Sequence, residues 1–268
     1  MLLTIDIGNT NIEFGVFEGQ DLIGSFRLGT NQDITSDEVG LFTCQFFQNS
    51  GLDRHDVDDI IIASVVPQVM YSINNAIKKY FFNKVPLVVG DNIPLQIVNL
   101  YDNPKDVGAD RLVAAVAAYH KYGGPLIVVD FGTATTFDAV GREGEYLGGA
   151  IYPGIKISME ALFSKTAKLP RVELVRPEKV IGRNTVASMQ AGAVYGYVGA
   201  VTNIVSTMID ELGKDTTVIA TGGLARLIGD QTNLFASIDR SLTLDGLRII
   251  YEQYKTSLRE AAGTMLIS

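Results

Sequence analysis

The sequence predicts an α/β fold built from two similar halves. Two short segments match each other, one from Asp6 to Asn11 (DIGNTN) and one from Asp130 to Thr135 (DFGTAT), and they lie 124 residues apart. Each follows a short run of Leu, Ile and Val that is typical of a buried strand, and each precedes a hairpin of alternating apolar residues. Because the offset is close to half of the 268 residues, we expect two lobes, residues 1–122 and 123–268.

The first half reads as a hairpin followed by alternating helices and strands. Strands are expected at 2–7, 12–17, 22–28, 59–66 and 86–89. A helix is expected from Ser36, as its N-cap, to about Ser50, with Asp37 and Glu38 in its first turn. Pro67 favours the start of a second helix that runs to about Tyr80. Irregular chain over 91–107 then leads into an Ala-rich helix over 109–119.

The second half repeats the strand pattern and ends in helices. Strands are expected at 126–129, 136–140, 145–151 and 217–220, and helices at 155–163, at 184–212 and from near Leu244.

Composition narrows the class of protein. With 47% hydrophobic and 19% charged residues the chain can form a proper core. Its net charge of −8 argues against nucleic acid as a partner, although a local anion site stays open. A single cysteine, Cys44, excludes an intrachain disulfide and favours a reducing compartment. We expect neither a signal peptide nor a membrane-spanning run, and therefore a cytoplasmic protein.

The two matching segments suit the binding of a nucleotide's phosphates. Glycine lets the backbone approach a ligand, and the hydroxyl, amide and N–H groups that follow can hold phosphate oxygens. The aspartate, at a strand end, suits a cation that accompanies the phosphates. Two facing loops would hold the phosphate tail from both sides, whereas a plain hairpin is the simpler explanation of one loop alone.

A third glycine motif, Thr221-Gly222-Gly223, ends a predicted strand. A base or ribose could lie against its bare backbone, although such junctions are common in α/β folds. Neither a dinucleotide-binding Gly-x-Gly-x-x-Gly pattern nor a P-loop occurs in the sequence. The two histidines, His55 and His120, are far apart and predict no metal cluster.

Together these motifs resemble the phosphate and adenosine motifs of the acetate-and-sugar-kinase/Hsp70/actin superfamily. The run from Tyr101 to Arg111 (YDNPKDVGADR) is similar to the Tyr…Pro…Gly-x-Asp-Arg pattern of type III pantothenate kinases, as are 182–185 (GRNT) and 189–192 (MQAG). The resemblance implies a duplicated actin-like (ribonuclease H-like) ATPase fold, with two lobes and a nucleotide cleft between them. It also implies ATP-dependent phosphorylation of pantothenate to 4′-phosphopantothenate, the first step of coenzyme A biosynthesis.

Asp110 and Arg111 have two interpretations on their own. Asp110 could take the proton of an alcohol during phosphoryl transfer, with Arg111 binding an anionic substrate. Alternatively, Asp110 caps a helix and pairs with Arg111 at the surface. The resemblance favours the first interpretation, with Asp110 as the proton acceptor.

The resemblance also implies the remaining roles. ATP would be bound by Asp6, Ile7, Gly8, Asn9, Thr10, Asn11, Ile12, Glu13 and Thr133, beside Gly222 and Gly223 of the third glycine motif. Pantothenate would be bound by Tyr101, Gly108, Ala109, Asp110, Arg111 and Thr185. Asp130 would bind a monovalent cation, K⁺ or NH₄⁺, and Mg²⁺ would accompany ATP.

The resemblance also implies a homodimer, with the 184–212 helix as the candidate interface, although a core helix of the second lobe fits that segment equally well. Two other functions stay open. One is a sugar kinase or polyphosphate phosphatase of the same fold, and the other is a nucleotide-binding regulatory protein without kinase activity.

Overall fold

The computed structural model describes residues 1–265, with side chains to residue 261. The chain forms two compact units, each with a five-stranded sheet and flanking helices. Unit 1 contains Met1–Ile97, Asn103–Ala117 and the chain from Thr243 onward, and unit 2 contains Val98–Asp102 and Ala118–Leu242.

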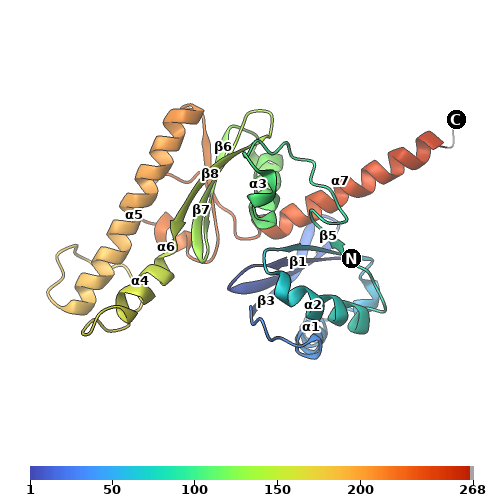
Figure 1. The fold of residues 1–268 in the computed structure, drawn as a ribbon, viewed down its shortest axis with the longest axis horizontal. Helices are drawn as coiled ribbons and strands as arrows, with labels where there is room; N and C mark the ends of the chain where they lie inside the picture. Colours follow the sequence, from blue (N-terminus) through green and yellow to red (C-terminus); the bar gives the residue numbers. More distant parts are fainter. Residues whose placement is uncertain (266–268) are drawn as a thin grey trace. The chain divides into compact units, whose positions relative to one another are not determined.

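The sheet of unit 1 has the strand order β3-β2-β1-β4-β5. Its strands are β1 (Leu2–Ile7), β2 (Asn11–Glu18), β3 (Asp21–Gly29), β4 (Asp59–Ser64) and β5 (Leu87–Val88). The first three pair antiparallel, and β4 and β5 add in parallel. Helices α1 (Ser36–Asn49) and α2 (Pro67–Tyr80) lie side by side against this sheet (Figure 1) and bury apolar side chains in one core with β1, β2 and β4.

The ends of α1 and α2 follow local sequence rules. Pro67 is the first residue of α2, as expected. The N-cap of α1 is Thr35 rather than the predicted Ser36, because Thr35 and Glu38 form a capping box in which each side chain binds the other's backbone N–H. Two 3₁₀ turns, η1 (Arg54–Asp56) and η2 (Pro104–Asp106), lie in segments expected to be irregular.

Unit 1 also holds the start of α3 (Ala109–Tyr122) and most of α7 (Leu242–Met265). Gly246 of α7 packs against the backbone of Val113, so closely that any side chain there would collide with it. Farther along α7, the Arg248 guanidinium lies 5.7 Å from the centre of the Phe17 ring. The predicted division at residue 122 therefore differs from the observed units, because the C-terminal helix packs on the first sheet.

Unit 2 has a second sheet with the order β10-β9-β6-β7-β8. Its strands are β6 (Leu126–Phe131), β7 (Ala134–Val140), β8 (Tyr146–Pro153), β9 (Thr217–Thr221) and β10 (Ser237–Ile238), and its further helices are α4 (Ile155–Ser164), α5 (Thr185–Leu212) and α6 (Ala225–Gly229). Helix α5 lies beside the strands of this sheet (Figure 1), and its residues Tyr197, Val201 and Val205 are buried in one core with them. Only the short α6 and β10 lack a counterpart among the expected elements.

The two sheets repeat one pattern of strand pairing. In each, a strand pairs antiparallel with the next strand and parallel with a later one. The burial patterns of β1 and β6 are identical, and Asp6 and Asp130 are the one half-buried position in each strand. This confirms the duplication expected from the matching segments.

Helix α5 differs from the expectation that no segment is long and apolar enough to span a membrane. It is long and apolar enough, by length and composition, to cross a membrane, with a mean hydropathy of 1.2 in an 18-residue window. This stretch was not expected from the sequence, because Gly, Ser and Thr interrupt its apolar residues. It has no charged residue before Asp210. Only 22% of that window is buried, so much of the helix surface is open within the chain.

Candidate active site

The loop after β1 presents polar groups on a fixed backbone. The Gly8 N–H donates to the Asn11 carbonyl (3.0 Å), and the Thr30 hydroxyl donates to the Gly8 carbonyl (2.6 Å). The intervening Asn9 and Thr10 are exposed. The loop therefore holds its shape through the end of β3 and leaves its side-chain oxygens and amide accessible to a ligand.

A row of charged side chains crosses the sheet beside this loop. Asp6 faces Glu13 in the β1–β2 register, and Glu13 faces Arg27 in the β2–β3 register. Residues directly opposite in antiparallel strands share one face of the sheet. Glu13 and Arg27 form an ion pair, so Arg27 offsets the repulsion between two neighbouring carboxylates.

Asp110 lies at the start of α3, at the same end of unit 1 as the β1 loop. The Val65 N–H donates to the Ile7 carbonyl (3.0 Å), and a Cβ on Gly108 would lie 3.2 Å from the Val65 side chain. The Asp110 carboxylate folds back over Gly108 and accepts the backbone N–H of Arg111 (2.8 Å). Asp110 and Arg111 are both half-buried, which disfavours the interpretation as a surface pair.

The matching loop of unit 2 follows β6. The Gly132 N–H donates to the Ala134 carbonyl (3.1 Å), and Gly132 and Thr133 are exposed. The third glycine motif packs here: a side chain at Gly222 would collide with Oδ1 of Asp130, and Gly222 has a φ of +91° that glycine favours. The structure thus brings Asp130 and Gly222 together.

The strand neighbours of Asp130 carry oxygen atoms and no charge. Thr221 and Thr136 face Asp130 in the strand register, so its neighbours carry neutral oxygens. Among the described residues, His, Cys, Asp and Glu side chains form no group of three that could hold a metal ion. Carboxylate and hydroxyl oxygens are hard ligands, so this position offers donors for a cation.

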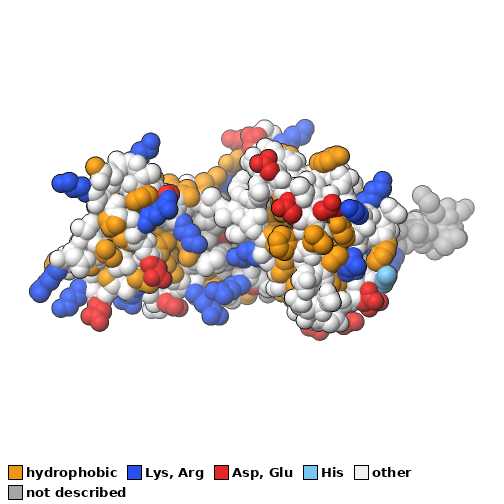
Figure 2. Space-filling model, turned by 90° about the horizontal axis from the view of Figure 1, so that it is seen from below, with side chains coloured by type: hydrophobic (Ala, Val, Ile, Leu, Met, Phe, Trp, Pro, Cys, Tyr) orange, Lys and Arg blue, Asp and Glu red, His pale blue; other side chains and the backbone are white. Residues whose placement is uncertain are grey.

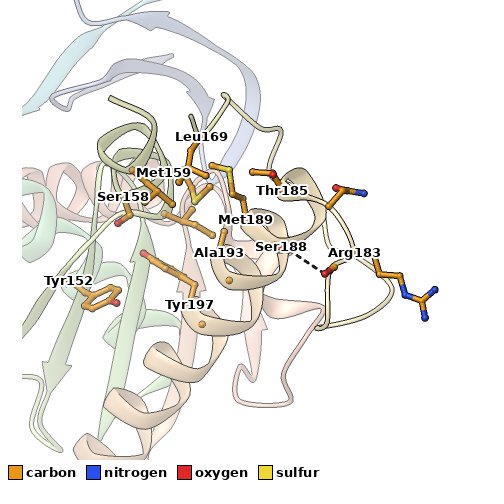
Figure 3. Close-up of a pocket in the computed structure, with 16 residues that line it drawn as sticks. Tyr152, Ser158, Met159, Leu169, Arg183, Thr185, Ser188, Met189, Ala193 and Tyr197 are labelled. Atoms are coloured by element: carbon orange, nitrogen blue, oxygen red, sulfur yellow. Dashed lines mark hydrogen bonds between the residues drawn. The ribbon is translucent and has the colours of Figure 1, made fainter. Parts of the chain in front are cut away.

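Thr185 lines a pocket between α4 and α5 with a volume of about 900 Å³. The pocket is mainly apolar, with Met159, Leu169 and Met189 on its walls (Figure 3). Thr185 is the first residue of α5, after the Asn184 cap whose side chain accepts the Ala187 N–H (2.8 Å). The pocket therefore opens beside a helix N-terminus, where backbone N–H groups favour an anion.

Tyr197 connects this pocket with the sheet, and sequence reasoning did not select it. Its hydroxyl donates to the Pro153 carbonyl (3.1 Å) and shares a short hydrogen bond with Thr135, two residues after Thr133. Burial raises the pKa of Tyr197, so the phenol stays neutral. A tyrosine within an otherwise apolar helix was the available signal, because a buried hydroxyl needs a partner.

The predicted site residues divide between the two units. Unit 1 holds Asp6 to Glu13 and Gly108 to Arg111, and unit 2 holds Tyr101, Asp130, Thr133, Thr185, Gly222 and Gly223. Each unit therefore carries one Asp-x-Gly loop together with part of the predicted acceptor site.

Comparison with known proteins decides the family. The family model of type III pantothenate kinase matches residues 2–207. The chain belongs to the type III pantothenate kinase family. A type III pantothenate kinase from Moorella thermoacetica (strain ATCC 39073 / JCM 9320) is 51% identical over 253 residues, which cover 94% of this chain and 99% of that protein.

Solved structures place this family member in the actin-like ATPase and sugar-kinase fold. The activator of 2-hydroxyisocaproyl-CoA dehydratase from Clostridium difficile, with bound ADPNP, has a TM-score of 0.53 and 12% identity, and the match covers 97% of each chain. The ethanolamine utilization protein EutJ from Carboxydothermus hydrogenoformans has a TM-score of 0.54 and 13% identity, covering 91% of this chain and 88% of that one. The fold class expected from the sequence is therefore confirmed.

Basic side chains gather near the pocket of this family member. Segment 156–183 carries seven Lys and Arg and three Glu, all exposed, although the whole chain has a net charge of −8. Figure 2 shows Lys and Arg side chains over this part of unit 2. The Arg183 side chain lines the pocket edge and points away from its interior (Figure 3). The charges of this cluster are spread over 28 residues, so they form no dense basic run in the sequence.

Proposed function

We propose that this chain transfers the γ-phosphoryl group of ATP to the primary hydroxyl of pantothenate, giving 4′-phosphopantothenate, the first step of coenzyme A biosynthesis. Membership of the type III pantothenate kinase family supports the reaction. The structural observation that carries the proposal is the repeated Asp-x-Gly loop at the same position of two equivalent sheets.

Residues 6–13 and Thr133 would hold the phosphates of ATP, and Gly222 and Gly223 would lie against its adenosine. The bound ADPNP named for the Clostridium difficile activator supports nucleotide binding in this fold. ATP is used with Mg²⁺, which neutralises charge on the transferring phosphoryl group. The Asp6 carboxylate is a hard oxygen donor suited to orienting that ion or its water.

Asp110 would accept the proton of the pantothenate hydroxyl. Asp110 lies in the first turn of α3, and a carboxylate within reach of the hydroxyl is a suitable general base. Arg111, half-buried beside it, would bind an anionic group of the substrate.

Tyr101, the run Gly108–Arg111 and Thr185 would bind the remainder of pantothenate. Pantothenate is a carboxylate, so the basic segment 156–183 beside the Thr185 pocket would raise its local concentration. Asp130 would hold K⁺ or NH₄⁺ near the phosphates, where the cation supplies positive charge.

The protein would act as a cytoplasmic homodimer in which a second copy covers α5. Gly192, Gly196 and Gly199 of α5 border open space, and Val186 is 43% exposed. A small-residue face lets another backbone approach closely. Sedimentation of the wild type and of Gly196→Glu would test this. Wild-type protein that sediments as a monomer at micromolar concentration would contradict it.

The decisive experiment measures ADP release by purified protein with ATP, with and without pantothenate and K⁺. We expect release that depends on pantothenate, and Asp110→Asn should lower kcat by about 10²–10⁴. Asp106→Asn is the matched control, because Asp106 is an exposed carboxylate four residues away that accepts a hydrogen bond from Asn103 (2.8 Å). Equal turnover by the two variants would refute the assigned base, and ATP binding without turnover would favour the regulatory alternative.

A further inference from the structure

Segment Val98–Asp102 joins unit 2 as a short strand-like addition beside β8. The Tyr146 N–H donates to the Val98 carbonyl (2.8 Å), and the Leu100 N–H donates to the Tyr146 carbonyl (2.9 Å). Asn99 and Tyr146 form an isolated parallel bridge. The position of this segment, which ends next to Tyr101, is therefore set by the backbone of one residue of β8.

The side chain of Tyr101 also rests on this part of β8. Its ring centre lies 6.4 Å from that of Tyr146, within the range for interacting aromatic rings. A Cβ on Gly148 would lie 3.5 Å from the Tyr101 ring, so the ring packs over bare backbone. The Tyr101 N–H donates to Oδ1 of Asn99 (3.0 Å). Tyr101 is half-buried, so part of the residue is accessible to a ligand.

Tyr146 is in turn fixed by a buried carboxylate. The Tyr146 side chain is fully buried, and its hydroxyl donates to Oδ1 of Asp138 on β7 (2.7 Å). Asp138 is only 1% exposed, and its Oδ2 accepts a hydrogen bond from the Thr136 hydroxyl (2.9 Å). Burying a carboxylate is costly, and an apolar pair of similar size would pack there at lower cost. A hydrogen-bonded acid, by contrast, fixes the direction of the Tyr146 ring.

We propose that Asp138 and Tyr146 are positioning residues that hold Tyr101 in place for the acceptor substrate. This rests on the proposed function, in which Tyr101 contacts pantothenate. Asp138 orients the Tyr146 hydroxyl, the Tyr146 backbone holds segment 98–102, and its ring supports Tyr101. Neither residue needs to touch the substrate, and neither belongs to an Asp-x-Gly loop.

The test is Tyr146→Phe, which removes one hydroxyl and keeps the ring. A looser Tyr101 weakens the binding of pantothenate and leaves that of ATP unchanged. We therefore expect the KM for pantothenate to rise about tenfold, with the KM for ATP and kcat within about twofold of the wild type. Tyr119→Phe is the matched control in the same unit, because its hydroxyl donates to the Arg142 carbonyl (3.2 Å), and it should change neither KM.

Two further variants separate positioning from general stability. Asp138→Asn keeps an oxygen that can accept from Tyr146, so we expect a smaller rise in the same KM. In a Tyr101→Ala background, Tyr146→Phe should cause no further rise, because both substitutions remove the same interaction. Circular dichroism and thermal melting of each variant establish that it is folded.

Each outcome decides one question. A lower melting temperature with an unchanged KM for pantothenate, or equal rises of both KM values, would overturn the positioning role. The positioning role would also be overturned if Tyr146→Phe raised the KM for pantothenate as much in the Tyr101→Ala background as in the wild type. Wild-type protein that turns over no pantothenate would refute the proposed function itself, and this inference with it.

Discussion

The two Asp-x-Gly hairpins share their backbone plan and differ in what faces the aspartate. In unit 1 the cross-strand neighbours of Asp6 are Ala63 and Glu13, and Glu13 is paired with Arg27. In unit 2 the cross-strand neighbours of Asp130 are Thr136 and Thr221, which are uncharged. The first loop has three residues between its strands, and the second has two.

This difference indicates that duplication preserved the place of the acid and changed its electrostatic surroundings. In unit 1 a charged row lies beside the loop, and under the proposed function its acids would face the Mg²⁺ that accompanies ATP. In unit 2 the strand neighbours of the aspartate are uncharged, and under the proposed function this position would hold the monovalent cation. The two halves therefore offer matched positions for substitutions that should have unequal effects.

The largest expected effect separates the two aspartates directly. Asp6→Asn and Asp130→Asn should each lower kcat/KM by on the order of 10²–10³, since each removes a carboxylate proposed to hold a cation that neutralises the phosphates. Only Asp130→Asn should abolish stimulation by K⁺. ADP release measured with and without K⁺ checks this, and loss of the K⁺ response in Asp6→Asn alone would reverse the assignment.

A second substitution tests the close packing of Gly222 against Asp130. Gly222→Ala forces a Cβ into the carboxylate of Asp130 at a positive φ, so we expect a destabilisation of about 1–3 kcal/mol. Activity should fall with it. Gly29→Ala is the control, because a Cβ there meets no atom within 4 Å. Thermal melting measures both, and equal melting temperatures of the two variants would contradict the packing argument.

Arg27→Met tests the charged row of unit 1. It leaves Glu13 facing Asp6 without its cation, and two acids then repel the triphosphate. We expect the KM for ATP to rise about fivefold, which corresponds to about 1 kcal/mol. Adding Glu13→Gln should restore most of the loss. If the double variant binds ATP no better than Arg27→Met, repulsion by Glu13 is not the cause.

The smallest expected effect concerns α7, which only unit 1 receives. Asp59 accepts hydrogen bonds from Tyr251 (2.5 Å) and Lys255 (3.1 Å). Burial opposes ionisation, but these two hydrogen bonds outweigh it and hold the pKa of Asp59 below its usual value. The interaction therefore stabilises the fold above the unfolded pKa of about 3.9 and is lost as the pH falls through the lower folded value.

Tyr251→Phe should accordingly destabilise the protein by about 0.5–1 kcal/mol at pH 7 and by less near pH 3, because Asp59 is partly exposed. Tyr254→Phe, on the same helix, is the control. Urea unfolding at the two pH values measures the difference, and an equal loss at both would argue against the ionised Asp59 as the partner.

Regular elements could be predicted well because their causes are local. Apolar runs located the strands of both sheets, and Pro67 located the start of α2. The helix from 109 was expected to end at 119 but continues to Tyr122. Short elements such as α6 and β10 escaped prediction, because five residues or fewer carry too little periodicity.

Only part of the candidate site could be predicted from the sequence. The loops were selected because Asp-x-Gly recurs after a buried strand in both halves, and Gly222 was selected because it follows a third predicted strand. Tyr197, Tyr146 and Asp138 were missed, because their importance depends on partners 8 to 62 residues away. The Glu13–Arg27 pair was missed for a related reason, since only the strand register brings the two together.

The route of the chain between the units has a consequence for biosynthesis. The chain leaves unit 1 after Ala117 and returns at Thr243, where α7 packs against Val113, Phe17 and Asp59. On the ribosome, all of unit 2 is therefore made before unit 1 receives its last helix. The first sheet is therefore synthesised well before α7, and the apolar surface that α7 covers stays without this helix until all of unit 2 has been made.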